Sequence, residues 1–262
     1  MTRIAITGAA GRMGRRIAAL ALADERFQLV SAMESAGHEA MGADVGALCG
    51  AGACGLAVSE KLQGSPQVII DFSVPEATLQ WLDAARQGKI AMVIGTTGLT
   101  ESQLAEVADA AAQIAIMQAP NMSVGVNVLF KVVGQVAAAL GDEYDIEIAE
   151  THHRFKKDAP SGTALGLARS ICKATGRDVG EVLVHGRSGP CPRKPGEIGM
   201  HALRVGDTVG EHSVHFGCLG ETVTISHSAH TRETFVRGAL RAAEWVASKK
   251  PGLYTMQDVL GL

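Results

Sequence analysis

Short apolar segments rich in β-branched residues recur through the first part of the chain, and stretches that favour helix separate them. We expect buried strands at 4–7, 29–33, 68–72, 92–95 and 114–117, and helices at 12–23, 76–86 and 104–112. Pro75 suits a first helical position, and Thr100 with Gln103 forms a capping box, so two of these helices carry start signals. Strands that alternate with helices over short connections predict βαβ units and a parallel sheet.

The pattern changes near residue 121. Polar and apolar residues alternate at 145–150, 201–205, 212–217 and 221–227, as in half-buried strands, and helices are expected at 126–140 and 161–174. Strands clustered in this way favour a second, α+β domain with a mixed or antiparallel sheet. A last helix is expected at 233–248. Residues 37–55, rich in glycine and alanine and without a clear period, are expected to form a long mobile loop.

Composition narrows the functional classes. Of the 262 residues, 47% are hydrophobic, 19% charged and only 4% aromatic, and the formal net charge is −3. This balance argues against a basic, aromatic-rich nucleic-acid surface. Five scattered cysteines without a CxxC pair argue against disulfides and zinc, so we expect no metal and a reducing cytoplasm. Neither a signal peptide nor a membrane-spanning apolar run is visible, and no membrane association is expected.

The first candidate site is a glycine turn between a strand and a helix, in the run Gly8-Ala9-Ala10-Gly11-Arg12-Met13-Gly14. Glycines there let the backbone and the helix amides approach a diphosphate closely. Glu34, at the end of the next strand, can accept hydrogen bonds from an adenosine ribose. We therefore expect a dinucleotide site. The alternative is a structural turn in an α/β domain that binds no nucleotide.

Residues near Glu34 bear on the choice of cofactor. Ser35 follows it, and no lysine or arginine occurs between Glu34 and Lys61. The Glu34 carboxylate repels the 2′-phosphate of NADPH, and the arginines at 12, 15 and 16 compensate only in part. NADH is thus expected to be favoured, with NADPH tolerated.

Two further turns follow strands of the expected parallel sheet. Gly95-Thr96-Thr97 and Ala119-Pro120-Asn121-Met122 both lie where the carboxyl end of such a strand meets a ligand crevice. The alternatives are a flexible strand–helix turn for the first segment and a plain linker for the second.

The segment richest in chemistry spans residues 150–163. Five side chains of basic type precede a Pro-Ser-Gly-Thr run that opens a helix: His152, His153, Arg154, Lys156 and Lys157. Histidine and lysine can move protons or hold carboxylates, and helix amides bind anions, so the combination suits a small dicarboxylate that is gripped and protonated. The alternatives are a solvated charged face, a metal site and an RNA patch. A metal site would need acidic or thiol ligands at suitable spacing nearby, and these are missing. An RNA patch would need aromatic residues, which are scarce in this chain.

Taken together, these segments resemble the dihydrodipicolinate reductase (4-hydroxy-tetrahydrodipicolinate reductase) family over nearly the whole chain. The most specific match is the pattern E-x-H-H-x-x-K-x-D-x-P-S-G-T from Glu150 to Thr163. The glycine turn, the GTTG run at 95–98 and the NMSVGVN run at 121–127 also match. Further matches are Arg204-x-Gly206, Gly210-Glu211-His212, Arg232-x-x-Phe235, Gly238-Ala239 and Trp245.

The resemblance implies an oxidoreductase of the diaminopimelate route to lysine. Such an enzyme uses NAD(P)H to reduce a cyclic dicarboxylate formed by loss of water from 4-hydroxy-tetrahydrodipicolinate. It implies that His152 and Lys156 are catalytic, and that substrate is bound by His153, Ser161, Gly162 and Thr163. The implied cofactor-binding residues are Gly8, Ala9, Ala10, Gly11, Arg12, Met13, Glu34, Gly95, Thr96, Thr97, Ala119, Pro120, Asn121 and Met122.

The family fold implies an α/β protein with a Rossmann-like, parallel-sheet domain at 1–123 plus 232–262. Residues 124–231 are expected to form an α+β domain whose mixed sheet serves substrate binding and a homotetramer. Ser35 departs from members that carry arginine there, and Lys157 beside Lys156 is a milder departure. Spacing to His152 favours Lys156 for the catalytic role.

Two rival functions remain at this stage. One is another two-domain dehydrogenase, which needs a nucleophilic cysteine beside a histidine motif or a different arrangement of lysine and aspartate. The other is a non-catalytic dinucleotide sensor, for which the cluster from His152 to Lys156 is superfluous.

Overall fold

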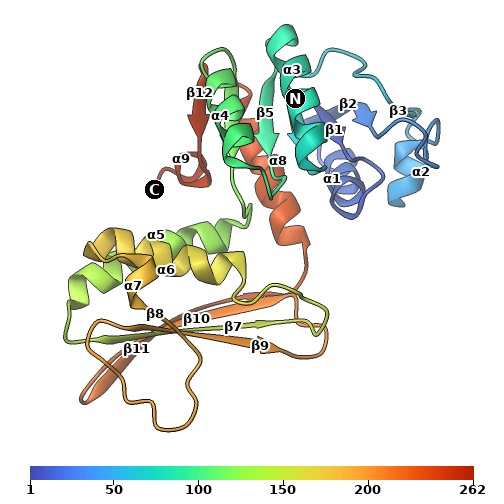
Figure 1. Ribbon diagram of the computed structural model, residues 1–262. Helices are drawn as coiled ribbons and strands as arrows, with labels where there is room; N and C mark the ends of the chain where they lie inside the picture. The colour runs from blue at the N-terminus through green and yellow to red at the C-terminus, as the bar shows by residue number, and fades with distance from the viewer. The chain divides into compact units, whose positions relative to one another are not determined.

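The computed structural model describes residues 1–262, which divide into two compact units. Unit 1 comprises Met1–Val124 and Glu233–Leu262, and unit 2 comprises Gly125–Arg232 (Figure 1). Each junction lies one residue beyond the expected one. None of the helices has both the length and the apolar composition that a membrane crossing requires.

Unit 1 is built on a seven-stranded sheet in the order β12-β6-β5-β4-β1-β2-β3. All neighbouring strands are parallel, which confirms the expected sheet. The strand order reverses between β1 and β4, so their carboxyl ends border the crevice where such sheets bind ligands. The strands are β1 (Thr2–Thr7), β2 (Phe27–Met33), β3 (Val58–Ser59), β4 (Val68–Asp71), β5 (Ala91–Ile94), β6 (Ala115–Gln118) and β12 (Gly252–Tyr254).

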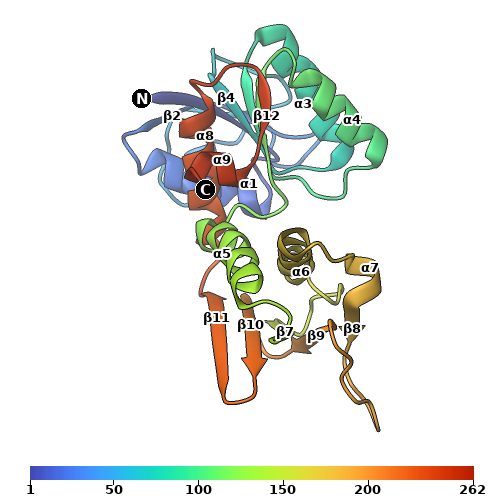
Figure 2. The same cartoon turned by 90° about the vertical axis from the view of Figure 1, so that its left-hand side faces the viewer.

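Helices cover both faces of this sheet (Figure 2). α1 (Arg12–Leu22) and α8 (Glu233–Val246) share one apolar core with the sheet, and α3 (Pro75–Gly88) and α4 (Glu101–Ala110) share the other. Because both faces are covered, β4 and β5 are buried at every position. The expected helix starts are confirmed: Pro75 begins α3, and Thr100 with Gln103 forms the capping box of α4.

The segment 37–55, expected to be a long mobile loop, is irregular over most of its length but includes one unexpected helix. The segment contains the short helix α2 (Val45–Cys49), whose first residue is fully buried. The Asp44 carboxylate accepts hydrogen bonds from the backbone N–H groups of Ala47 (3.0 Å) and Gly55 (2.7 Å), so one side chain folds the segment back on itself. A helix of five residues is too short to give a periodic pattern. The C-terminal helix α9 (Met256–Leu260) is equally short and shows no periodic pattern either.

Unit 2 has a five-stranded mixed sheet in the order β11-β10-β7-β9-β8. β10 runs antiparallel to β7 and β11, whereas β9 runs parallel to β7 and β8, which confirms a mixed sheet. α5 (Val124–Leu140), α6 (Gly162–Thr175) and the short α7 (Val179–Val182) lie on one face (Figures 1 and 2). The strands are β7 (Asp145–His152), β8 (Leu183–His185), β9 (Ile198–Arg204), β10 (Gly210–Cys218) and β11 (Glu221–Ala229).

Candidate active site

The predicted glycine turn joins β1 to α1 in unit 1. Gly8 has φ +61°, and a Cβ there would lie 2.9 Å from the carbonyl oxygen of Phe72, so the position requires glycine. A Cβ on Gly14 would lie 2.1 Å from the carbonyl oxygen of Gly8, so the helix packs directly on the turn. Gly11 is the N-cap of α1 and donates its N–H to the Gly8 carbonyl at 3.0 Å. The turn therefore brings bare backbone to the start of the helix, as an anion site requires.

A cleft of about 570 Å³ lies beside this turn. The Glu34 carboxylate is held at its edge, because it accepts hydrogen bonds from the backbone N–H groups of Ala10 (3.1 Å) and Ser35 (2.9 Å). The cleft has the size of a small-molecule site, and its glycine turn and carboxylate fit the adenosine half of a dinucleotide. Its lining residues are Gly8, Gly11, Glu34, Ser35, Ala36, His38, Glu60, Lys61, Phe72, Ser73, Val74, Ala77, Gln80 and Trp81.

The other predicted cofactor residues of unit 1 lie outside the lining of this cleft. Arg12 and Met13 form the first turn of α1. The segments 95–97 and 119–122 follow β5 and β6, so they lie at the same edge of the sheet as the glycine turn. Within them Thr96, Ala119 and Met122 are buried, and Asn121 accepts the Ser123 N–H at 2.8 Å.

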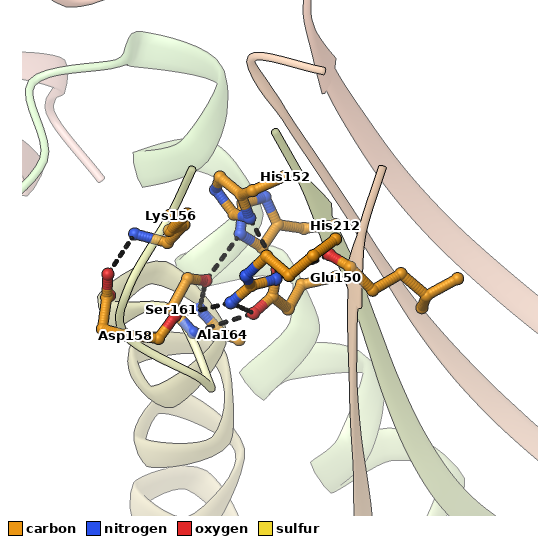
Figure 3. A network of polar contacts seen from close by, with 9 residues as sticks. Glu150, His152, Lys156, Asp158, Ser161, Ala164 and His212 are labelled. Atoms are coloured by element: carbon orange, nitrogen blue, oxygen red, sulfur yellow. Dashed lines mark hydrogen bonds and ion pairs between the residues drawn. The ribbon is translucent and has the colours of Figure 1, made fainter. Parts of the chain in front are cut away.

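The predicted catalytic histidine of unit 2 belongs to a buried network at the end of β7 (Figure 3). Glu150 and His152 are two residues apart on this strand, so their side chains point to the same face. His152 Nδ1 lies 2.5 Å from Glu150 Oε2. Since a carboxylate only accepts, Nδ1 carries the proton and donates it, which leaves Nε2 of the neutral ring as an acceptor. Gly210 leaves room at this atom, because a Cβ there would lie 3.0 Å from Nε2.

Arg204 and Ser161 complete the coordination of the Glu150 carboxylate. The guanidinium of Arg204 donates from Nη1 (2.8 Å) and Nη2 (2.9 Å), and the Ser161 N–H donates at 3.0 Å. Burial alone would raise the pKa of Glu150, but the hydrogen bonds from Arg204 and then His152 outweigh it and lower that pKa below its usual value. Burial lowers the pKa of His152, and the carboxylate opposes this only in part. The site therefore pairs an ionised Glu150 with a neutral His152 near pH 7.

His212 extends the network toward α6. Its Nε2 lies 3.1 Å from the Ser161 hydroxyl, which also accepts the N–H of Ala164 as the N-cap of α6. Its ring meets that of His152 edge-on, with centroids 5.1 Å apart. Burial lowers the pKa of His212 to about 4, and nearby His152 adds to the effect. His212 is therefore neutral near pH 7, and its hydrogen bond with the Ser161 hydroxyl helps to fix the start of α6.

Lys156 lies in the loop between β7 and α6. Its ammonium donates to Asp158 Oδ1 at 2.8 Å, and this bond lowers the pKa of Asp158. The Lys156 side chain is only 21% exposed. By contrast, Lys157 is an exposed residue, so the structure distinguishes the two neighbouring lysines.

The predicted substrate residues cluster around the same loop. His153 is half-buried, and its backbone carbonyl accepts the Lys156 N–H at 3.0 Å. Gly162 and Thr163 form the first turn of α6, and a Cβ on Gly162 would meet no atom within 4 Å. The helix start is therefore open at Gly162, whereas Ser161 is 2% exposed with its hydroxyl engaged.

Sequence reasoning assigned no site role to Glu150, Arg204 or His212, although all three belong to matched motifs. In the sheet register, Arg204 lies beside His152 on β9, and His212 lies opposite Glu150 on β10. The spacing of Glu150 and His152 by two residues in an alternating strand is the one local signal that pointed to a shared face. No group of acidic, cysteine or histidine side chains forms a candidate metal centre.

The fold and these sites define a class of protein, the two-domain oxidoreductases with a Rossmann-type unit. The chain belongs to the dihydrodipicolinate reductase family. Residues 2–122 match "Dihydrodipicolinate reductase, N-terminus", and residues 125–260 match "Dihydrodipicolinate reductase, C-terminus".

Full-length relatives agree with this assignment. The 4-hydroxy-tetrahydrodipicolinate reductase of Rubrobacter xylanophilus is 51% identical over 99% of this chain and 98% of its own length. That of Geobacter metallireducens is 50% identical over 100% of both chains. A dipicolinate-bound dihydrodipicolinate reductase from Paenisporosarcina sp. TG-14 shares the fold, with a TM-score of 0.77, 24% identity and 98% of each chain covered.

Proposed function

We propose that the protein catalyses the NAD(P)H-dependent reduction of 4-hydroxy-tetrahydrodipicolinate, in its dehydrated form, to tetrahydrodipicolinate in the diaminopimelate route to lysine. The observation that carries the proposal is the network of unit 2, in which one motif provides an oriented histidine, an ammonium group and an open helix start. These are the groups needed to grip and protonate a dicarboxylate. The names of the full-length relatives support the same activity.

Lys156 is the proposed proton donor. The nicotinamide, when bound, supplies a hydride that adds to ring C4 of the substrate. Electron density then moves toward C3 and the ring nitrogen, so a proton at C3 completes the reduction of the double bond. The half-buried ammonium of Lys156 can donate this proton, because it belongs to the same motif as His152 and Asp158 holds it in place.

His152 is proposed to orient the substrate, relay the proton and stabilise the enamine-like intermediate. Its Nδ1–H is taken up by Glu150, so only Nε2 remains to exchange a proton. His153 and the amides of Gly162 and Thr163 are proposed to hold the substrate carboxylates, with Ser161 acting as the cap that keeps the helix start in place. His152 and Lys156 therefore act on the ring, and the start of α6 acts on its acid groups.

In unit 1 the run from Gly8 to Met13 is proposed to surround the cofactor diphosphate, and Glu34 to bind the adenosine ribose. The segments 95–97 and 119–122 are assigned to the nicotinamide side. NADH is favoured because Glu34 and Ser35 line the cleft where a 2′-phosphate needs a cation. Lys61, the one lysine among the lining residues, supports residual use of NADPH.

We assign unit 1 to dinucleotide binding and unit 2 to substrate binding and assembly as a homotetramer in the cytoplasm. The sheet of unit 2 supports the assembly, since its helices lie on one face and Leu203 of β9 is 50% exposed (Figure 2). A sheet face without helices is available to pair with other copies of the chain.

The decisive experiment mixes the protein with the aldol product of pyruvate and aspartate semialdehyde and follows the absorbance of NADH or NADPH. We expect substrate-dependent oxidation with both, and a lower Michaelis constant for NADH. A dinucleotide sensor would bind NADH without turnover. A different dehydrogenase would consume cofactor only with another substrate, and either result overturns the proposal.

A further inference from the structure

A carboxylate outside the proposed catalytic network is buried at the centre of the nucleotide-binding edge of unit 1. Asp71, the last residue of β4, has no exposed surface. Four neutral hydroxyl groups donate to it: Thr7 (2.5 Å) and Ser73 (2.5 Å) to Oδ1, and Thr78 (2.6 Å) and Thr96 (2.8 Å) to Oδ2. Four donors match the four lone-pair sites of an ionised carboxylate. The chain thus devotes four side chains to keeping one charge inside a core.

The donors come from separate parts of the fold. Thr7 ends β1 just before the glycine turn, Ser73 precedes α3 and lines the cleft, and Thr96 follows β5. Thr96 also accepts the Ser73 N–H at 3.0 Å, so its hydroxyl links Asp71 to the turn after β4. The fourth donor, Thr78, lies inside α3. One carboxylate therefore connects the carboxyl ends of three neighbouring strands with a helix.

Stability alone does not call for this arrangement. A buried charge is costly to desolvate, and apolar groups of similar volume often serve a core as well or better. Apolar side chains occupy adjacent positions of β4 and β5, where Ile70 and Ile94 are fully buried. The Asp71 carboxylate instead lies between two turns at the ligand edge of the sheet, one containing Ser73 and the other Thr96. Ligand binding requires these two turns to keep a fixed spacing.

We propose that Asp71 is a positioning residue of the nucleotide site. Through Thr96 and Ser73 it holds the turn after β5 against the turn after β4, and so preforms the surface that receives the nicotinamide half of the cofactor. It touches no cofactor atom itself, being fully covered. This inference rests on the assignment of residues 95–97 to the nicotinamide side under the proposed function.

Two threonines provide a matched pair for the test. Thr96 and Thr78 donate to the same oxygen of Asp71, and valine replaces either with little change of shape. Only Thr96 belongs to the turn after β5, whereas Thr78 lies in α3. Thr96→Val and Asp71→Asn are therefore expected to weaken NADH binding, and Thr78→Val to leave it unchanged while lowering thermal stability.

Binding is measured without substrate, from quenching of protein fluorescence, because Trp81 lines the cleft. We expect the Kd for NADH to rise about tenfold in Thr96→Val and Asp71→Asn and to stay within about twofold in Thr78→Val. The Kd for AMP, which carries only the adenosine half, is expected to stay within about twofold in both threonine variants. A general loss of structure in Thr96→Val would weaken NADH and AMP together.

The inference is overturned if Thr78→Val weakens NADH as much as Thr96→Val, or if Thr96→Val binds NADH like the wild type. Should Asp71→Asn fail to fold, the comparison of the two threonine variants decides alone. Because no substrate is present, a failure of the proposed reductase activity would leave this result intact and be recognised separately.

Discussion

Replacing Glu150 by glutamine removes one negative charge from the centre of the unit 2 network and keeps the size of the side chain. If the amide oxygen takes the place of Oε1, it can still accept from the Ser161 N–H. The amide nitrogen then takes the place of Oε2, where it faces both Nη1 of Arg204 and the Nδ1–H of His152, and both of these are donors. The change therefore breaks a charge-assisted pair and releases the orientation of His152.

The magnitude follows from these contacts. Losing a partner in a fully buried ion pair lowers the free energy of unfolding by ~3–5 kcal/mol. The Arg204 side chain is 20% exposed and keeps some access to water, so we expect a smaller loss of ~2–3 kcal/mol. The melting temperature is expected to fall by ~5–10 °C. Since His152 loses the acceptor that fixes its tautomer, kcat is expected to fall about 10²-fold, within the range for disturbed acid–base chemistry.

Glu147→Gln is the matched control. Glu147 lies on the same strand, but an odd number of residues away, so it points to the opposite face of the sheet. There it contacts Arg187 at 3.1 Å and His201 at 2.6 Å, so its loss also weakens an ionic cluster. Its kcat is expected to stay within about twofold of wild type despite a lower melting temperature.

The assay follows NADH oxidation with the freshly formed aldol product, well below the melting temperature of each variant. A folded Glu150→Gln variant that keeps a kcat within about threefold of wild type would show that Glu150 does not orient His152 for catalysis. An equal loss of activity in Glu147→Gln would show the same, since stability and not the orientation of His152 would then explain the loss.

Three further predictions concern the proton donor, the cofactor and pH. Lys156→Ala is expected to lower kcat by ~10²–10⁴-fold with smaller changes in Michaelis constants, whereas Lys157→Ala stays active; near-full kcat in Lys156→Ala would remove that residue from the role. Ser35→Arg is expected to raise kcat/KM for NADPH about tenfold relative to NADH by adding a charge-assisted bond to the 2′-phosphate, and an equal change with both cofactors would contradict this. His212 has a pKa of about 4 in the folded state, below the ~6.5 of an unfolded histidine, so the folded state loses about 3 kcal/mol as pH falls from ~6.5 to ~4 and nothing above that window. Urea unfolding at several pH values checks this: His212→Gln is expected to show a shallower decline, and parallel curves for variant and wild type would refute it.

Much of unit 1 is readable from local sequence because its sheet is covered on both faces. Strands such as β4 and β5 are buried throughout, so each is an uninterrupted apolar run between turn residues. The start of α3 at Pro75 and the capping box at Thr100 depend on neighbours within one helical turn. The helix α2 and the strand β12 carry no such signal, since each is too short to show a period. Val45 of α2 is buried in the core of unit 1, and β12 pairs with β6, so both depend on residues far away in the sequence.

The alternation of strands and helices can be read from the chain alone. The same holds for the glycine turn and for the motif that contains His152, Lys156 and Ser161. All of these depend on the order of neighbouring residues, where backbone geometry links spacing directly to shared faces. Other contacts exist only in the folded chain: Arg204 pairs with Glu150 from 54 positions away, and His212 contacts Ser161 across 51 positions. The convergence of four hydroxyls on Asp71 is of the same kind. Such contacts depend on the register of strands that meet only when the sheet forms, and no local spacing encodes that register.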